Sequence, residues 1–315
     1  MKRVLLSIVA TCSLLNAGGY KVPEQSADSL GLAASNVAFS FGADAAYFNP
    51  ANMMFLDGLH HFESTLGWFH INSIDFKSDD GKSYSSKKFD SLAGTFSFVT
   101  PEIYENWRFG LALAVPAAVG ISWEDPETAF TGKRFKLQVV ELNPTVAYRI
   151  NDKLAVALGA RGVYSKGKIA SDFGGFGYRE IQGDGINYGY NVALTYRPIE
   201  DLSLAVTYRS KVDMELKGST DADFNGQLAP ISYHGKTSVK IPLPAQLVLA
   251  AGYKFSDFTL LLAFERTYWS KFKDYDFEFG DKTAAHTSSP LSGYFKSFMD
   301  DPVVKNAKDT NTYRI

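Results

Sequence analysis

The amino-acid sequence predicts an all-β transmembrane barrel whose lumen is plugged by a small N-terminal segment. Three observations predict this class: stretches of about ten residues with alternating apolar and polar side chains, aromatic residues near the ends of the apolar faces, and connections that alternate between short turns and long polar segments. A soluble β-sandwich would also show alternation. The barrel is favoured because sandwich strands usually have about five or six residues, whereas a tilted strand needs about 9–11 to cross the hydrocarbon.

Residues 1–17 have the features of a cleaved signal peptide. Lys2 and Arg3 precede an apolar stretch over residues 4–15, and Ala17 marks the expected cleavage site. The apolar stretch is too short to span a bilayer as a helix. A lipoprotein signal is disfavoured because Thr11 rather than a smaller residue precedes Cys12, the single cysteine of the chain. The mature protein therefore has no cysteine and cannot contain disulfides.

Residues 18–58 form a separate segment, rich in alanine, glycine and serine and without a sustained period of two. Short helical turns are expected over residues 26–37 and 44–47. Pro50 excludes the helical region for Asn49, so the chain should turn there. A segment of small residues in front of a barrel is a candidate plug, which we call the hatch. A disordered periplasmic arm is the alternative, but the phenylalanines of the segment argue against it.

Residues 59–315 are expected to form the barrel, because the dominant period is two from residue 59 onward. In residues 107–123 the odd positions are mostly large and apolar, from Trp107 to Trp123, while the even positions are small or polar. Residues 153–164, 186–197 and 202–212 alternate in the same way. This period is that of strands rather than helices, so each stretch should direct one face to the lipid and the other to the lumen.

The connections and the composition agree with a barrel. Short turns are expected at residues 149–154, 197–202 and 254–258, and long polar loops at 77–88, 124–135, 166–184, 214–236 and 273–309. Aromatic residues make up 14% of the chain, yet its mean hydropathy is only −0.12, as alternation would produce. The net charge of −2 gives no electrostatic footprint for nucleic acid.

Several basic residues are predicted to point into the lumen, because they share the inward parity of the strands. A carboxylate-bearing substrate could meet one or two of them, since arginine binds a carboxylate through two hydrogen bonds. The alternative is that they pair with lumenal acids, of which Glu265 is one candidate, or with the hatch. The predicted residues are Arg149, Arg161, Arg197, Arg209 and Lys211, with Lys254 sharing their parity.

The sequence contains no convincing enzyme motif, so we predict no catalytic residues, no metal and no cofactor. It lacks H-E-x-x-H and G-x-S-x-G, and the five histidines show no ligand spacing. The stretch "GDGINYG" (183–189) resembles a dinucleotide loop only by chance, because its last glycine is misplaced and it lies on a predicted strand. A barrel-borne Ser–His esterase is the remaining catalytic alternative.

The chain resembles the FadL-type outer-membrane transporters, which include the TodX-type hydrocarbon channels. Four blocks carry the resemblance in the order found in that family, and the first is the most specific. They are "GGYKVPEQSADSLGLAASNVAFSFGADAAYFNPANM" at the start of the hatch segment, "FGLALAVPAAVGISWED" at 109–125, "ELNPTVAYRINDKLAVALGARGVY" at 141–164, and "KTSVKIPLPAQLVLAAGYKFSDFTLLLAFERTYWSKF" at 236–272.

The resemblance implies a fourteen-stranded antiparallel barrel closed by an N-terminal hatch. Asn49, Pro50 and Ala51 would be the hatch motif, and Gly18, Gly19 and Tyr20 would form an N-terminal substrate pocket. Pro116 and Gly120 would mark a kink in the third strand that opens the wall sideways. A plain bulge at Pro116 is the alternative, since proline is tolerated in strands mainly at edges and bulges.

The resemblance also implies function and partners. The chain is expected to be a monomer in the Gram-negative outer membrane, inserted by the barrel assembly machinery among outer-membrane lipid and lipopolysaccharide. It would admit long-chain fatty acids by passive diffusion. Alternatives are an aromatic or alkane hydrocarbon channel of the same family, a general porin, or an adhesin.

One departure from the family pattern concerns length. Family members are longer and end on a strand with a terminal aromatic residue, whereas this sequence stops at "KDTNTYRI", where a tenth strand should begin. About nine complete strands are expected before it. Nine strands would leave unpaired backbone groups in lipid, so we expect the sequence to be a truncated form of a longer chain, with a degenerate gene as the alternative.

Overall fold

A computed structural model describes residues 19–225, 230–275, 277–280, 303–304 and 307–315. The predicted signal peptide, Gly18 and most of the predicted loop at 273–309 lie outside these residues. No helix within them has the length and hydrophobicity to cross a bilayer. The strands are β1 His61–Ile71, β2 Asp75–Lys77, β3 Ser83–Ser85, β4 Phe89–Val99, β5 Trp107–Ser122, β6 Arg134–Asn151, β7 Leu154–Asp172, β8 Gly177–Ile199, β9 Leu202–Arg209, β10 Val212–Asn225, β11 Pro230–Leu243, β12 Gln246–Lys254, β13 Thr259–Thr267, β14 Asp274–Tyr275, β15 Phe277–Phe279, β16 Val303–Val304 and β17 Thr310–Arg314.

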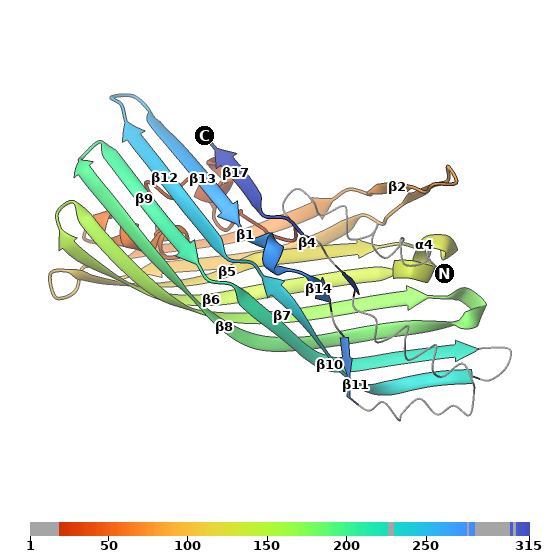
Figure 1. The fold of residues 1–315 in the computed structure, drawn as a ribbon. Coiled ribbons are helices and arrows are strands. Elements are labelled where there is room, and N and C mark those ends of the chain that lie inside the picture. The colour runs from red at the N-terminus through yellow and green to blue at the C-terminus, as the bar shows by residue number, and fades with distance from the viewer. Residues whose placement is uncertain (1–18, 226–229, 276, 281–302, 305–306) are drawn as a thin grey trace.

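Thirteen of these strands form one strongly curved antiparallel sheet (Figure 1). Its main path runs β1-β4-β5-β6-β7-β8-β9-β12-β13-β17, and β10, β11 and β15 extend it beside β8. Within the described residues β1 and β17 are the two ends of this path and do not pair with each other. The fold is therefore a barrel wall that is not closed. The strand expected at the end of the sequence is present as β17, which pairs with β13.

The period of two gives the sheet two different faces, as predicted. In β8, Thr195 is fully buried on the concave side, whereas the neighbouring Leu194 and Tyr196 are 38% and 42% exposed on the convex side. Small and polar side chains thus line the concave face, which we call lumenal, and large apolar side chains cover the outer face. This is the arrangement of a transmembrane barrel, whose outer face meets hydrocarbon.

The prediction of polar loops is wrong for two of the segments. Residues 166–184 and 214–236 mostly continue strands β7, β8, β10 and β11, and β8 alone has 23 residues. Because about 9–11 residues suffice to cross the hydrocarbon at a tilt, these strands must extend well beyond it. The outward-facing positions of these extensions are largely polar because water surrounds them there, whereas the inward-facing Ile181 and Leu216 are buried. The segment at 77–88 forms the β2–β3 hairpin, and that at 124–135 contains helix α4, Pro126–Gly132.

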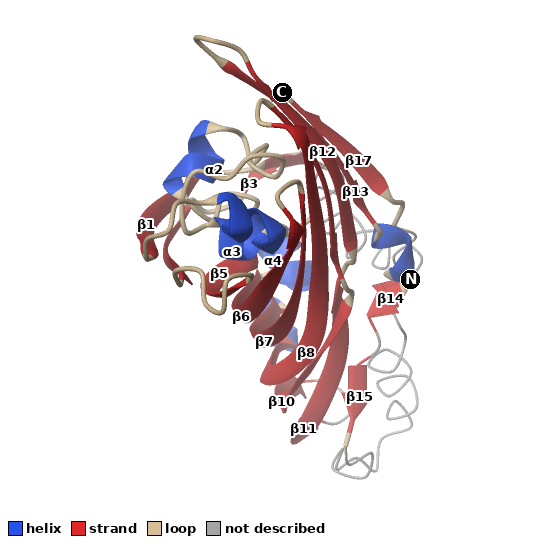
Figure 2. Ribbon diagram, turned by 90° about the vertical axis from the view of Figure 1, so that its left-hand side faces the viewer, coloured by secondary structure: helices blue, strands red, loops and turns tan. Residues whose placement is uncertain are grey.

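Residues 19–58 lie inside the curve of the sheet, where the hatch was expected (Figure 2). Their helices are α2 Ala27–Gly31, α3 Ala45–Phe48 and the 3₁₀ helix η1 Pro50–Phe55, and two further 3₁₀ turns, η2 Gly174–Phe176 and η3 Trp269–Lys271, lie in connections of the wall. Helix α2 begins at a capping box formed by Ser26 and Ser29. It ends earlier than predicted because Ala33 and Ala34 adopt positive φ angles, which end a right-handed helix.

Candidate functional site

The hatch contacts the lumenal wall mainly through small side chains. One buried cluster joins Ala45 and Met53 of the hatch to strands β4 to β8, and nine of its twelve members are alanine. A Cβ atom added at Gly110 of β5 would lie 2.5 Å from the Met53 sulfur. Small residues on both sides therefore allow the hatch backbone to approach the wall closely, with little volume to spare.

Asn49 and Asn52 connect the hatch to itself and to the wall. The Asn49 side-chain amide donates to the Val37 carbonyl at 2.8 Å and to the Thr195 hydroxyl at 2.9 Å, and its oxygen accepts from the Ala51 amide at 3.2 Å. The Thr195 hydroxyl in turn donates to the Asn52 side chain at 2.7 Å. Asn49 caps η1, and Pro50 occupies the first position of that helix. The Asn-Pro turn thus joins η1 to strand β8.

Strand β5 contains a bulge at Val115 and Pro116. Its register against β6 shifts by one residue between Ala114 and Ala117. The extra residue inverts the parity of the strand: Trp107 is 40% exposed on the outer face, but Ala117 is fully buried in the lumenal core. The prediction that the odd positions of 107–123 share one face is therefore wrong beyond the bulge.

The start of the hatch occupies the backbone groups that this bulge leaves unpaired. The Val22 amide donates to the Pro116 carbonyl at 3.0 Å, and the Ala118 amide donates to the Tyr20 carbonyl at 2.9 Å. The Gln25 side chain forms a matching pair with Val115: it accepts from the Val115 amide at 2.7 Å and donates to its carbonyl at 3.0 Å. Residues 20–25 therefore act as a partial strand beside β5.

A gap in the wall lies next to the bulge. Strand β4 pairs with β5 only from Phe96 opposite Leu113 to Val99 opposite Gly110, while the rest of β4 continues to pair with β1. Among the described residues, Gln25 reaches across the gap, since its carbonyl accepts from the Thr95 hydroxyl at 2.7 Å. Gly120 borders the gap, and a Cβ atom there would lie 2.6 Å from the Phe89 ring.

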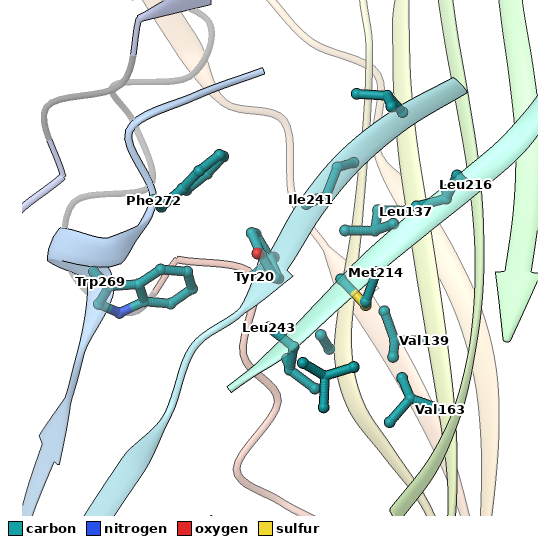
Figure 3. Packing of buried hydrophobic residues seen from close by; sticks show 13 residues of the cluster. Tyr20, Leu137, Val139, Val163, Met214, Leu216, Ile241, Leu243, Trp269 and Phe272 are labelled. Atoms are coloured by element: carbon teal, nitrogen blue, oxygen red, sulfur yellow. The ribbon is translucent and has the colours of Figure 1, made fainter. Parts of the chain in front are cut away.

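An apolar core surrounds Tyr20 on the other side of the bulge (Figure 3). The Tyr20 ring meets that of Trp269 edge to face with centroids 5.2 Å apart, and its hydroxyl donates to the Pro242 carbonyl. Gly19 has a φ of +64°, and a Cβ atom there would lie 2.4 Å from Trp269, so only glycine fits. The core is completed by Ala117, Leu137, Val139, Val163, Val212, Met214, Leu216, Val239, Ile241, Leu243 and Phe272.

Lys21 provides a cation beside this core, but it already has an acidic partner. Its ammonium group pairs with Glu265, whose other oxygen accepts from Arg314 at 2.9 Å. Burial lowers the pKa of Lys21, and the Glu265 carboxylate opposes that effect. Glu265 was predicted as a partner for the lumenal arginines of the barrel, whereas its partners are the N-terminal segment and β17.

Arg161 and Arg209 share one buried carboxylate, that of Glu141. Two nitrogens of Arg161 lie 3.1 Å and 2.8 Å from the same Glu141 oxygen, and Arg209 pairs with the other oxygen. Arg209 also donates to the Tyr47 carbonyl of the hatch at 3.0 Å, with its guanidinium 4.2 Å from the centre of the Tyr47 ring. Arg161 donates to the Ser210 carbonyl at 2.5 Å. Both arginines thus bind structural groups, the alternative considered for them.

The remaining predicted cations lie in different surroundings. Arg149 pairs with Glu102 at 2.9 Å, and Lys254 lies 4.8 Å from the centre of the Phe39 ring. Arg197 stacks on two hatch phenylalanines and has no acidic partner within the described residues.

Lys211 is not lumenal. It pairs with Asp213 at 2.9 Å on the outer face, because the parity of the strand inverts between Arg209 and Val212.

Asp44 is a buried carboxylate within the hatch itself. One of its oxygens accepts from the Ser26 hydroxyl and the Asn36 amide, both at 2.7 Å. Burial raises the pKa of Asp44 to about 7, and the nearby carboxylates of Glu63 and Asp28 act in the same direction. Asp44, which precedes α3, therefore accepts from the α2 cap Ser26 and keeps its proton to a higher pH than an exposed aspartate would.

The comparison with known proteins identifies the family. The family model of outer membrane protein transport proteins (OMPP1/FadL/TodX) matches residues 7–298. The chain belongs to this family. Outer membrane protein P1 of Haemophilus influenzae is 22% identical over 89% of this chain and 73% of the relative. The long-chain fatty acid transport protein of Escherichia coli K12 is 24% identical over 66% of this chain, which spans 55% of that relative.

Solved structures of the FadL/TodX family share the fold. A Pseudomonas aeruginosa FadL homologue superposes with a TM-score of 0.71 at 17% identity, covering 93% of this chain and 76% of that one. The toluene transporter TbuX of Ralstonia pickettii gives 0.72 at 20% identity, covering 91% and 80%. The chain is therefore an outer-membrane β-barrel protein of a Gram-negative family whose members are channels for hydrophobic compounds, among them fatty acids and aromatic hydrocarbons.

Sequence reasoning missed several residues of this FadL-type site. Gln25, Asn52 and Thr195 make the contacts that fix the hatch, and Glu141 binds both buried arginines. Glu141 could have been found, because it is the single acid with lumenal parity in residues 137–147. Trp269 had no comparable signal, since its contact with Gly19 joins residues far apart in the chain.

Proposed function

We propose that this protein carries hydrophobic molecules into the cell by passive diffusion, with long-chain fatty acids as the first substrate class. The molecule would descend through the lumen to the apolar core around Tyr20. It would then leave sideways through the gap between β4 and β5. The hatch motif Asn49-Pro50-Ala51 and the N-terminal residues Gly18, Gly19 and Tyr20 would control this passage, with Pro116 and Gly120 at the lateral gate.

The single observation that carries the proposal is the unpaired wall beside Pro116. An open strand edge in lipid leaves backbone groups without partners, which costs several kcal/mol for each group. Here residues 20–25 supply those partners through hydrogen bonds from main chain and from Gln25. A wall closed by a separate segment can open when that segment moves, whereas a continuous ladder cannot.

The substrate is either a fatty acid or an uncharged hydrocarbon, and specific contacts bear on the choice. A fatty-acid carboxylate would need a cation, and among the five predicted cations Arg197 has no acidic partner within the described part of the chain. The core around Tyr20 is apolar and aromatic, and Lys21 beside it is paired with Glu265. Because the Lys21 ammonium group is already paired with Glu265, the core favours an uncharged molecule, and an aromatic hydrocarbon is therefore the second candidate substrate.

Uptake by cells that lack their own transporter tests the function. Labelled oleate and labelled toluene should be offered separately to cells producing the wild type, Asn49→Ala or Pro50→Ala. We expect both variants to insert in the outer membrane but to take up the preferred substrate at least fivefold more slowly. The matched control is Asn151→Ala, whose side chain caps an exposed turn. Unchanged uptake by the hatch variants would contradict the role given to the hatch.

A disulfide tests the lateral gate directly. Lys21 and Ala117 form an isolated antiparallel bridge flanked by two hydrogen bonds, a pairing with Cα atoms about 4.5 Å apart that a disulfide can span. In Lys21→Cys/Ala117→Cys, oxidation should hold the N-terminal segment on β5 and stop uptake, and reduction should restore it. Equal rates in the two redox states would argue against this gate.

A further inference from the structure

Strand β8 changes its partner halfway along the wall. It pairs with β9 as far as Asn191 opposite Arg209, and with β10 from Asp184 opposite Lys217 onward. The register differs by one residue between the two halves. No ladder pair joins residues 185–190 to residues 210–216, all of which the structure describes. We call this stretch the β8–β10 seam.

One backbone hydrogen bond and the side chains of Ser210 and Asn187 close the seam instead of a ladder. At the end of the seam next to Asn191, the Ser210 amide donates to the Tyr190 carbonyl at 2.9 Å. The Ser210 hydroxyl in turn accepts from the Tyr190 amide at 2.9 Å. Further along, the Asn187 amide group bridges the partner strand. With its NH₂ group turned toward the Asp213 carbonyl, its nitrogen lies 3.0 Å from that oxygen and its oxygen lies 3.2 Å from the Glu215 amide.

Glycines allow the two strands to overlap at the seam. A Cβ atom at Gly185 would lie 2.0 Å from the Glu215 carbonyl oxygen, and one at Gly189 would lie 2.7 Å from a Val212 methyl group. The odd positions of β8 face the lumen, so at these two glycines β10 lies close against the inner side of β8. The stretch "GDGINYG" (183–189), for which no function was predicted from the sequence, contains these two glycines.

The seam separates the apolar core from the outer surface by a single layer of chain. On the lumenal side Val212 and Met214 belong to the same buried core as Tyr20. On the outer side Ile186 and Tyr188 are 63% and 78% exposed, and the Lys211–Asp213 ion pair lies on the same outer face. An apolar molecule in the core therefore lies next to two weak places in the wall, the gap beside β4 and this seam.

A buried charge cluster connects the seam to the hatch. Arg161 donates to the Ser210 carbonyl, which belongs to the seam, and Arg209 donates to the Tyr47 carbonyl, which belongs to the hatch. Glu141 binds both arginines. Movement of α3 would remove Tyr47 from Arg209 and disturb the carboxylate that also orients Arg161.

We propose that the β8–β10 seam is a second lateral portal through which apolar molecules leave the core for the membrane. This inference rests on the proposed function and extends it. Opening a regular ladder of this length would break about one backbone hydrogen bond for each residue. Opening the seam requires that the side chains of Asn187 and Ser210 release their partners and that one backbone hydrogen bond, from the Ser210 amide to the Tyr190 carbonyl, breaks, while Arg161 transmits the position of the hatch.

A reversible disulfide across the seam tests the portal. Because a Cβ atom at Gly189 would lie 2.7 Å from a methyl group of Val212, the Cβ atoms at the two positions fall within the range a disulfide accepts. The mature chain has no other cysteine if the signal peptide is removed at the expected site. In Gly189→Cys/Val212→Cys, we expect oxidation to slow uptake at least threefold relative to the reduced form of the same protein and reduction to restore it, whereas uptake by each single-cysteine variant should be the same in the two redox states.

The outcomes separate this inference from the proposed function. If oxidation blocks uptake in Lys21→Cys/Ala117→Cys but not in Gly189→Cys/Val212→Cys, the seam is a structural bulge and the proposed function stands. If neither disulfide changes uptake and Asn49→Ala also leaves uptake unchanged, both this inference and the proposed function fail. If oxidation slows uptake only in Gly189→Cys/Val212→Cys, the seam is the main exit.

A second variant covers the case in which Gly189→Cys prevents folding. Asn187→Ser shortens the bridging side chain and should raise uptake at least twofold by loosening the seam. The control is Gln182→Ser, on the outer face of β8 in its laddered part. Equal uptake by Asn187→Ser and the control would overturn the portal.

Discussion

Removing the Glu141 carboxylate should be among the most destabilising single changes in the wall. The side chains of Glu141, Arg161 and Arg209 are 0%, 2% and 10% exposed, so Glu141→Gln leaves two guanidinium groups in the interior with one neutral acceptor between them. Breaking a buried pair by removing one partner costs about 3–5 kcal/mol. Because glutamine retains an oxygen acceptor, we expect a loss near the lower value, about 3 kcal/mol, in the free energy of unfolding.

The assay is denaturant unfolding of the protein in detergent or lipid vesicles, with wild type and variant compared under identical conditions. The triple variant Glu141→Leu/Arg161→Met/Arg209→Met removes all three charges and should regain most of the lost stability, since apolar replacement of a buried ion cluster is often neutral. A loss below about 1 kcal/mol for Glu141→Gln, or a triple variant no more stable than the single one, would refute the idea that the carboxylate offsets both arginines.

Three further changes test the hatch and its surroundings. Burial raises the pKa of Asp44 from 3.8 to about 7, so the folded state binds its proton more tightly, and stability should fall by at most about 1.4 kcal/mol per pH unit as pH rises from about 4 to 7. Asp44→Asn should remove this slope from unfolding measured across that range; a persistent slope would assign it to another group. Gly19→Ala should displace Trp269 and lower the Tm by several degrees, followed by tryptophan fluorescence, because glycine alone fits there; an unchanged spectrum and Tm would contradict the packing. Gly110→Ala should cost about 1–3 kcal/mol by overpacking the hatch, whereas Gly94→Ala, with no atom within 4 Å of the new Cβ, should be nearly silent; equal losses would mean that the hatch adjusts freely.

The sequence predicted the elements of the wall because lipid and lumen impose opposite polarity on alternate residues. It also distinguished residues 18–58 from the strands, since Pro50 and the surrounding small residues differ so clearly from them. The phase of the alternation was not predictable at two points. At Pro116 both faces carry small or apolar residues, and around Val212 the even positions are mostly apolar both before and after the inversion, so the pattern cannot show that its parity has inverted.

Long-range partners were harder to predict than elements. Arg161 and Arg209 were recognised as lumenal by parity, but pairing them with Glu141 requires the register of the four strands β6 to β9, which composition does not contain. Polarity also misled at 166–184, where a long strand outside the hydrocarbon has the composition of a loop. The substrate class of the FadL-type site depends on such tertiary details, which explains why residue types alone left it open.

The two inversions of parity have a consequence for how genes of this kind can change. A loop tolerates the gain or loss of a codon, since its neighbours keep their orientation. Deleting the single codon for Pro116 would instead remove the extra residue, and one half of β5 would then turn its lipid-facing side chains inward. At these two positions selection must preserve the number of residues more strictly than their identity. Substitutions that leave the number of residues unchanged should be accepted more readily.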